Sequence, residues 1–171
     1  MNYSKLFGLF SAIVIALPVT AVDTINLAGD WRLAGTDEKG AAVECPIAVP
    51  GGVHTALIKA GISPDPFFGR TERDIQWVGR HDWTISRTFD ASADLLAKKA
   101  IVLRLEDVDL FADIYLNGNL LGATSNRFCR YEFDLKPYLK PGVNELKGVF
   151  KSSENECRRL DELYSLSLIH I

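Results

Sequence analysis

The sequence predicts an all-β protein with the architecture of a jelly-roll β-sandwich. Short segments of alternating apolar and polar residues recur along the chain, and residues that favour turns, such as Gly, Pro and Asn, separate them. Only one stretch before the C-terminal region has a helical pattern. Many short strands at this spacing are typical of sandwiches and jelly rolls. The chain has 171 residues, 47% of them hydrophobic, which is enough for one sizeable core.

The first half of the chain holds few expected elements. In order, they are a strand over residues 27–33, a turn over 49–52, a helical turn over 53–60 and a loop over 62–73. Trp31 is the large apolar anchor of the strand, and Gly61 ends the helical turn. We expect Phe67 and Phe68 to pin the long loop to the sandwich.

The second half is richer in strands. They are expected over residues 82–89, 100–106, 111–116, 120–122, 131–135 and 143–151. Asn117-Gly118 predicts a β-hairpin, because both residues tolerate positive φ. The alternation places Ala112, Ile114 and Leu116 on one core-facing side.

Two residues interrupt the apolar faces of these strands. Arg87 falls on the same face as Trp83, Ile85 and Phe89, so we expect it to meet solvent or a carboxylate. Gly148 falls on the inward face of the last strand, where a glycine leaves a gap or marks a bulge.

Residues 1–21 have the pattern of a signal peptide. Lys5 supplies a positive charge, residues 6–19 are mainly apolar, and Val19-Thr20-Ala21 places small residues at a cleavage site. The apolar run is short for a membrane span, which needs about 20 residues; an uncleaved anchor or a buried helix is the alternative. We therefore expect a secreted or periplasmic protein with no membrane segment after cleavage, and a mature sandwich domain over residues 22–157.

Residues 158–171 fit the β pattern poorly. Residues 158–162 have the composition of a helix start, whereas residues 165–171 form an apolar run. We expect this segment to be a truncated tail, partly an artefact of sequencing; the alternative is a genuine, frayed C-terminal strand.

Composition argues against several functions. The net charge of −3 and the lack of long runs of like charge argue against a nucleic-acid binder. Cys45, Cys129 and Cys157 have no metal-binding spacing, and their odd number argues against a disulfide framework. His54 and His81 lie far apart in sequence with no evident third ligand. We therefore expect no metal and no cofactor.

No catalytic residue is predicted. The densest acidic cluster comprises Glu106, Asp107, Asp109 and Asp113. Its spacing matches no calcium loop, so a solvated strand end explains it better. Residues 70–74 are expected to form a salt-bridged loop surface, and no nucleophile-elbow motif is present.

The three tryptophans are candidates for a sugar-stacking surface. Trp31 and Trp83 occupy apolar strand positions, so we expect them in the core. Trp77 lies in a loop between Gln76 and Gly79, and is therefore the candidate for an exposed aromatic side chain, at a sugar-binding or an interdomain face.

An ordered set of segments resembles the β-mannosidases of glycoside hydrolase family 2. The segments are Val-Pro-Gly-Gly-Val-His-Thr-Ala-Leu (49–57), Ile-Ser-Pro-Asp-Pro-Phe-Phe-Gly (62–69), Gln-Trp-Val-Gly (76–79), Asp-Trp (82–83), Phe-Ala-Asp-Ile-Tyr-Leu-Asn-Gly (111–118), Arg-Tyr-Glu-Phe-Asp (130–134) and Leu-Lys-Pro-Gly (139–142). The Pro-Asp-Pro loop and the Gln-Trp-Val-Gly segment are specific to the β-mannosidase branch. The resemblance covers residues 25–157.

This resemblance implies a galactose-binding-like jelly roll that packs beside a catalytic (β/α)₈ barrel. In a retaining glycosidase of this kind an acid/base and a nucleophile lie about 5 Å apart, and in this family both belong to the barrel. A barrel needs about 250 residues, and neither it nor the family's Trp-Asp-Trp-Gly-Pro motif is in this sequence.

The resemblance therefore implies a non-catalytic, N-terminal domain of an enzyme that hydrolyses terminal β-D-mannose. Its implied partners are the missing catalytic barrel and an oligosaccharide. The alternative is a free-standing exported carbohydrate-binding or interaction module.

Overall fold

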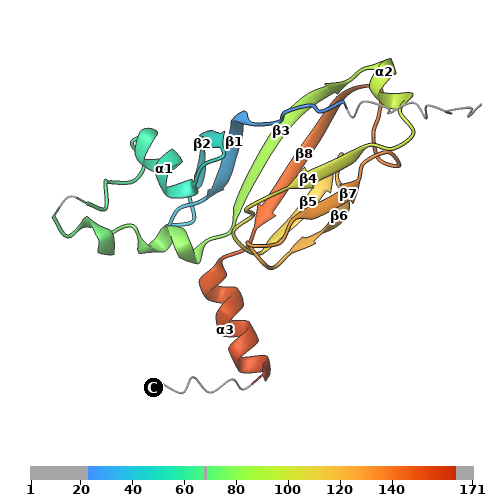
Figure 1. Cartoon of the computed structure of the whole chain (residues 1–171). Helices are drawn as coiled ribbons and strands as arrows, with labels where there is room; N and C mark the ends of the chain where they lie inside the picture. Colours follow the sequence, from blue (N-terminus) through green and yellow to red (C-terminus); the bar gives the residue numbers. More distant parts are fainter. Residues whose placement is uncertain (1–22, 68, 165–171) are drawn as a thin grey trace, which may run out of the picture.

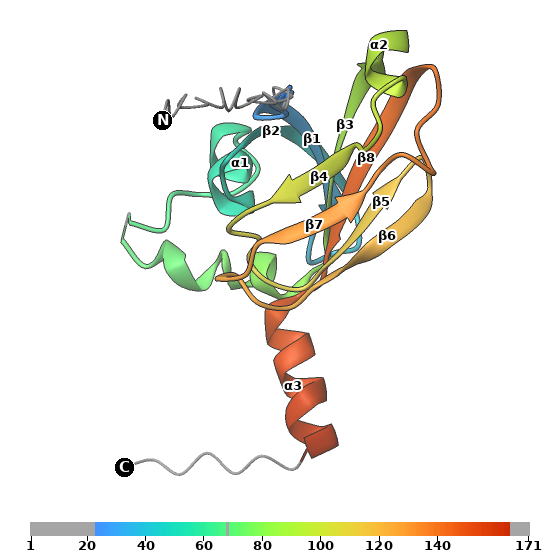
Figure 2. The ribbon, with the colours of Figure 1, turned by 45° about the vertical axis from the view of Figure 1, so that its right-hand side comes forward.

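The computed structural model describes residues 23–67 and 69–164. The predictions for the signal peptide over residues 1–21, for Phe68 and for residues 165–171 lie outside this part. The described chain forms an antiparallel β-sandwich in which a two-stranded sheet lies across a six-stranded sheet (Figures 1 and 2). The predicted all-β jelly-roll sandwich is confirmed.

The larger sheet has the strand order β2-β1-β3-β8-β5-β6, and β4 pairs with β7 in the smaller one. The strands are β1 (Gly29–Thr36), β2 (Ala42–Val49), β3 (Trp83–Ala91), β4 (Val102–Leu105), β5 (Ala112–Leu116), β6 (Asn119–Thr124), β7 (Tyr131–Asp134) and β8 (Gly142–Phe150). Sequence reasoning missed β2. It is an edge strand, where Pro46 is tolerated because a missing ladder hydrogen bond matters less there.

Three α-helices and two short 3₁₀ helices surround the sheets. They are α1 (Val53–Lys59), η1 (Thr71–Arg73), η2 (Gln76–Arg80), α2 (Ala93–Leu96) and α3 (Ser153–Tyr164). The helical turn expected over residues 53–60 is confirmed as α1, whereas the C-terminal helix begins five residues before the expected start. None of the helices in the described residues is long and apolar enough to cross a membrane.

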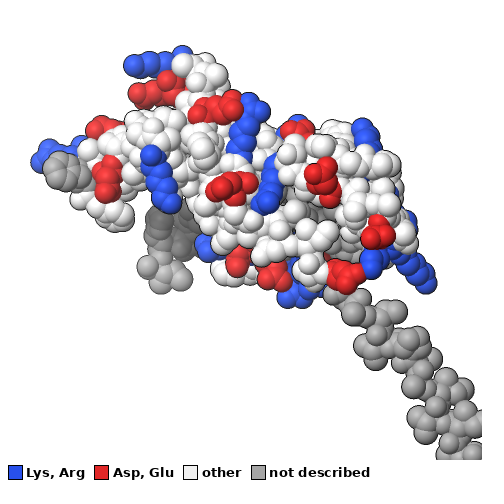
Figure 3. Space-filling view, turned by 90° about the horizontal axis from the view of Figure 1, so that it is seen from above, with Lys and Arg blue, Asp and Glu red and all other residues white. Residues whose placement is uncertain are grey.

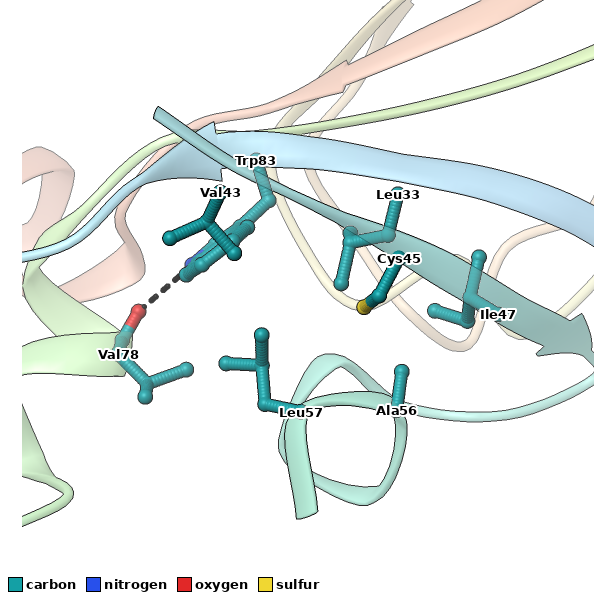
Figure 4. Packing of buried hydrophobic residues seen from close by; sticks show 8 residues of the cluster. All are labelled: Leu33, Val43, Cys45, Ile47, Ala56, Leu57, Val78 and Trp83. Atoms are coloured by element: carbon teal, nitrogen blue, oxygen red, sulfur yellow. Dashed lines mark hydrogen bonds between the residues drawn. The ribbon is translucent and has the colours of Figure 1, made fainter. Parts of the chain in front are cut away.

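One core cluster lies between α1 and the β1–β2 edge of the large sheet (Figure 4). Inward-facing side chains of the two strands meet Ala56 and Leu57 of α1; they are Leu33, Val43, Cys45 and Ile47. Trp83 closes the end of this cluster, where its indole N–H donates a 2.9 Å hydrogen bond to the Val78 carbonyl. This bond also fixes η2 against the sandwich.

The second core cluster lies between the two sheets. Its buried members are Leu103, Ala112, Ile114, Leu116, Leu135 and Leu146. The predicted core face of residues 112, 114 and 116 is therefore confirmed. Trp31 is half-buried and packs against both clusters, so one side chain joins the two halves of the core.

Buried hydrogen bonds fix the turns at one end of the sandwich. Asn117 and Gly118 both have positive φ, at 51° and 82°, as the hairpin prediction required. The fully buried Asn144 uses its whole amide group: Oδ1 accepts from the Lys140 N–H and the Asn117 side chain, and Nδ2 donates to the carbonyls of Lys140 and Gly142. This amide therefore connects β8, the preceding loop and the hairpin.

The structure corrects both expectations about the interrupted apolar faces. The guanidinium group of Arg87 contacts backbone carbonyls instead of a carboxylate: it donates to the carbonyls of Leu27 and Ala28. Gly148 is regularly paired on both sides, so it marks no bulge. It leaves no gap either: a Cβ added there would lie 3.1 Å from the Phe150 ring and 3.6 Å from Ile114. Neighbouring side chains therefore already fill the space.

Candidate functional site

Trp77, the aromatic residue expected to be exposed, is half-buried in η2. Its ring lies 5.9 Å from the ring of Trp83 and 5.7 Å from that of His81. The Nδ1–H of His81 donates a 2.8 Å hydrogen bond to the Trp77 carbonyl. Trp83 is 4% exposed, as the core prediction required. The side chain of Trp77 is therefore partly packed against the domain and partly exposed, and its role at a sugar-binding or interdomain face stays a prediction.

The most exposed aromatic side chains in the described residues are two phenylalanines. Phe67 is 95% exposed, so the expectation that it pins the long loop to the sandwich is wrong. Its N–H donates to the Asp65 carboxylate in a local turn, which accounts for the loop conformation without any contact of the ring. Phe128 is 93% exposed and was missed by sequence reasoning. Its exposure could have been predicted from the sequence, because Phe128 is an aromatic residue among mainly polar ones in a loop between two strands.

The β6–β7 loop, which carries Phe128, lies at the end of the sandwich from which α3 projects (Figure 1). Ala112, which follows the β4–β5 loop, pairs with both Phe150 and Thr124, at the ends of β8 and β6. Leu105 pairs with Tyr131, the first residue of β7. The β4–β5 loop, the β6–β7 loop and the start of α3 therefore lie at one end.

A shallow hollow of about 200 Å³ lies beside Phe128. Its lining residues come from the two loops and are Glu106, Asp107, Arg127, Phe128, Cys129 and Arg130. Arg130 lies 2.9 Å from Glu106, and Arg127 lies 3.6 Å from Asp109. Planar guanidinium donors and carboxylate acceptors thus alternate beside an exposed ring.

The backbone that carries Phe128 is held in place by its neighbours. The Tyr131 hydroxyl accepts the N–H groups of Ser125 and Asn126, at 3.0 and 2.8 Å, and donates to the Asn126 carbonyl. The Asn126 side-chain oxygen accepts the Phe128 N–H at 2.9 Å. The Tyr131 ring in turn stacks on Phe133. The loop therefore presents Phe128 in a defined orientation.

The acidic cluster expected at the strand end is divided among separate ion pairs. Besides the two pairs in the hollow, Asp113 lies 3.0 Å from the ammonium group of Lys151. This contact raises the pKa of Lys151. Within the described part of the chain, no group of three metal-ligating side chains comes together. Three of the four carboxylates of this cluster, those of Glu106, Asp109 and Asp113, are therefore ion-paired at the surface.

A larger open hollow, of about 640 Å³, lies over β1, β2, β3 and β8. Arg32 interacts with two carboxylates of this hollow: it lies 2.5 Å from Glu44 and also interacts with Glu145. The hydrogen bond from Arg32 lowers the pKa of Glu44. Short side chains, Ser86 and Thr88, line the same hollow. The lining therefore combines charged, polar and apolar side chains, and Trp31, its one aromatic residue, is half-buried.

Nothing in these hollows has the properties of a glycosidase acid. Such an acid needs a raised pKa, whereas Glu44, which lines the larger hollow, has a lowered pKa because Arg32 hydrogen-bonds to it. His54 is exposed on α1. Over the face shown in Figure 3, basic and acidic side chains are intermixed rather than gathered by sign.

Two smaller expectations have clear outcomes. Residues 70–74 were expected to form a salt-bridged surface, but no ion pair links their charged side chains, all of which lie in the described range, so that expectation is wrong. All three cysteines are free; Cys45 is buried, and Cys129 and Cys157 are exposed. Burial raises the pKa of the Cys45 thiol.

Comparison with known proteins gives consistent matches. Mouse β-mannosidase is 32% identical over 142 residues, which cover 82% of this chain and 16% of that protein. A probable β-mannosidase of Caenorhabditis elegans is also 32% identical, over 81% of this chain and 15% of its own length. The chain thus spans about one sixth of the length of these relatives.

Solved structures show the same fold. The β-D-mannosidase of Dictyoglomus thermophilum superposes with a TM-score of 0.79 at 34% identity, over 85% of this chain and 18% of that one. A β-glucuronidase of Bifidobacterium dentium superposes with a TM-score of 0.54 at 24% identity, which shows a shared fold alone.

A family of domains also matches most of the chain. The family described as "Glycosyl hydrolase 2 galactose-binding domain-like" matches residues 31–168, which include β1 through α3. The sandwich, the sequence relatives and the superposed mannosidase agree with this match. The chain belongs to the galactose-binding-like domain family of glycoside hydrolase family 2, and is homologous to the N-terminal domain of the β-mannosidases.

Proposed function

We propose that this chain is the non-catalytic N-terminal domain of a β-mannosidase-like glycoside hydrolase, and that the complete enzyme removes terminal β-D-mannose residues. The observation that carries the proposal is the alignment with mouse β-mannosidase, which spans 82% of this chain but only 16% of the relative. The superposition on the solved mannosidase likewise covers 85% of this chain but only 18% of that one. The domain is thus a small part of each of these relatives.

The electrostatics of the domain support a non-catalytic role. Hydrolysis with retention needs an acid/base and a nucleophile about 5 Å apart. Two of the carboxylates that line the hollows are held by arginines, Glu44 by Arg32 and Glu106 by Arg130. A carboxylate that is ion-paired on an exposed surface is poorly suited to donate a proton at neutral pH.

The partner that we propose is the catalytic part of the same enzyme. α3 projects away from both sheets and carries Leu163 and Tyr164, which are 63% and 64% exposed (Figure 1). Arg80 and Asn155 fix its first turn to η2. A helix that is anchored at one end and apolar at the other suits an interface within a larger protein.

An activity assay and gene sequencing test the proposal. The purified chain is incubated with an aryl β-mannoside beside a full-length β-mannosidase, and we expect release of the aryl group at the rate of buffer alone. Turnover that survives repurification contradicts the non-catalytic role. Sequencing the gene beyond this segment should reveal a reading frame several times longer than this one.

A free-standing exported binding module is the second candidate. The exposed Phe128, on a loop with a hydrogen-bonded backbone beside a polar hollow, supports a binding role that needs no other domain. A stop codon shortly after the segment would favour this candidate over the enzyme domain.

We also propose that the protein is exported to the periplasm or the medium, on the composition of residues 1–21. N-terminal sequencing of the exported protein should begin at Val22. A mature protein that retains Lys5 contradicts the cleavage site.

A further inference from the structure

Phe128 differs from an ordinary exposed apolar residue in how firmly its backbone is held. Single hydrophobic side chains are common on protein surfaces and need no explanation. Here the Tyr131 hydroxyl, the Asn126 side chain and two arginine–carboxylate pairs surround the loop. A loop whose backbone is already ordered loses little backbone entropy when a ligand binds beside it, which favours binding.

The hollow beside the ring has donors and acceptors but little apolar surface. The Arg127 and Arg130 guanidinium groups present several N–H donors in a plane, and the Glu106 carboxylate presents acceptors. Their side chains remain more than half exposed despite the ion pairs, so a ligand can reach them. A flat apolar face with polar groups at its edge is complementary to a pyranose ring, which has C–H groups on its face and hydroxyls on its rim.

We propose that the β6–β7 loop is a non-catalytic binding site for β-linked mannose oligosaccharides, with Phe128 stacked on a sugar ring and Arg127, Arg130 and Glu106 bound to its hydroxyls. This choice of sugar rests on the proposed function. The site is distinct from Trp77, whose ring is engaged with Trp83 and His81.

Stereochemistry predicts which mannosides bind. In a β-mannopyranoside chair, the hydrogens of C1, C3 and C5 are axial on one face, and the axial O2 lies on the other. That first face is a continuous C–H surface, which suits the electron-rich face of an aromatic ring. In an α-mannoside the glycosidic oxygen is axial on the same face and obstructs stacking. The site should therefore prefer β-linked over α-linked mannose.

The test is an NMR titration of the ¹⁵N-labelled chain with β-1,4-mannobiose, with α-1,2-mannobiose and cellobiose as comparison sugars. One stacked sugar ring on an open surface corresponds to a Kd on the order of 1–10 mM. Amide shifts should concentrate at residues 106–107 and 127–130. Phe128→Ala should weaken binding at least about tenfold, since most of the contact area is lost. Phe67→Ala is the matched control, because Phe67 is equally exposed in a different loop, and it should bind as the unaltered chain does.

Each outcome decides the proposal. Saturable binding of the β-mannoside that requires Phe128 supports it. No shift up to about 50 mM sugar, or shifts that Phe128→Ala leaves unchanged, overturns it. Equal binding of cellobiose or the α-mannoside overturns the choice of sugar. If no sugar binds and Phe128→Ala abolishes self-association in sedimentation, the loop is a protein contact instead. The proposed mannosidase function is tested separately, by the length of the reading frame beyond this segment.

Discussion

Gly35 of β1 is a position where a single added methyl group would collide with a buried aromatic ring. A Cβ added there would lie 2.5 Å from Cε3 and 2.7 Å from Cζ3 of Trp83. Both distances are well below van der Waals contact, so the ring or the strand must move. Because Gly35 has no positive φ, backbone strain does not contribute, and the predicted effect is a steric one.

The Trp83 ring has little freedom to move aside. It is 4% exposed, its N–H is bonded to the Val78 carbonyl, and Trp77 packs against it. Overpacking of a close-packed site costs about 1–3 kcal/mol. For a domain of this size each kcal/mol lowers the Tm by about 2–4 °C, so Gly35→Ala should lower it by roughly 2–12 °C.

The measurement is urea unfolding followed by circular dichroism and tryptophan fluorescence. Gly79→Ala is the matched control: no atom lies within 4 Å of its added Cβ, so it should leave stability unchanged or raise it slightly. In a Trp83→Leu background, the cost of Gly35→Ala should shrink, because the obstructing ring is gone. A Gly35→Ala protein as stable as the unaltered chain, or an equal cost in both backgrounds, refutes the steric argument.

Three further predictions follow from the buried groups. Gly148→Val should destabilise the domain by about 1–3 kcal/mol in urea unfolding, because Phe150, Ile85 and Ile114 already fill the space; a gain in stability would show an unfilled gap. Asn144→Ala should cost about 1–3 kcal/mol in the same assay, since it leaves partly buried backbone groups of the adjoining loop unpaired, and an unchanged midpoint would contradict this. Ellman's reagent should modify Cys129 and Cys157 in the native protein and Cys45 only after unfolding, because burial shields that thiol and raises its pKa; rapid native reaction of all three would disprove it.

Local patterns predicted the elements whose determinants lie close together in sequence. The Asn117-Gly118 hairpin and the core face of β5 follow from turn chemistry and from strict alternation, and both are found. The strand β2 also alternates, with Val43, Cys45 and Ile47 inward. It was missed because Pro46 argues against a strand unless the strand is known to lie at an edge, and edge position is a property of the whole sheet.

Features that depend on distant segments were predicted poorly. Arg87 bonds to carbonyls about 60 positions earlier in the chain, which no periodicity in β3 reveals. Gly148 looked like a gap because its filling comes from three different strand positions. The exposed Phe128 was missed for a similar reason: how far Trp77 and Phe128 are exposed depends on what packs against each ring, and only the folded chain determines that.

Asn144 helps to determine the register in which β8 pairs with β3 and β5. A slip of one residue would turn the apolar face of β8 toward solvent, and hydrophobicity alone opposes it. A slip of two residues would return apolar side chains to the core, so hydrophobicity discriminates against it weakly. The amide of Asn144, however, meets the Lys140 backbone and the Asn117 side chain in only one alignment. Any other even slip would bury that amide without partners, so a single polar residue selects one strand register from those that the apolar pattern leaves open.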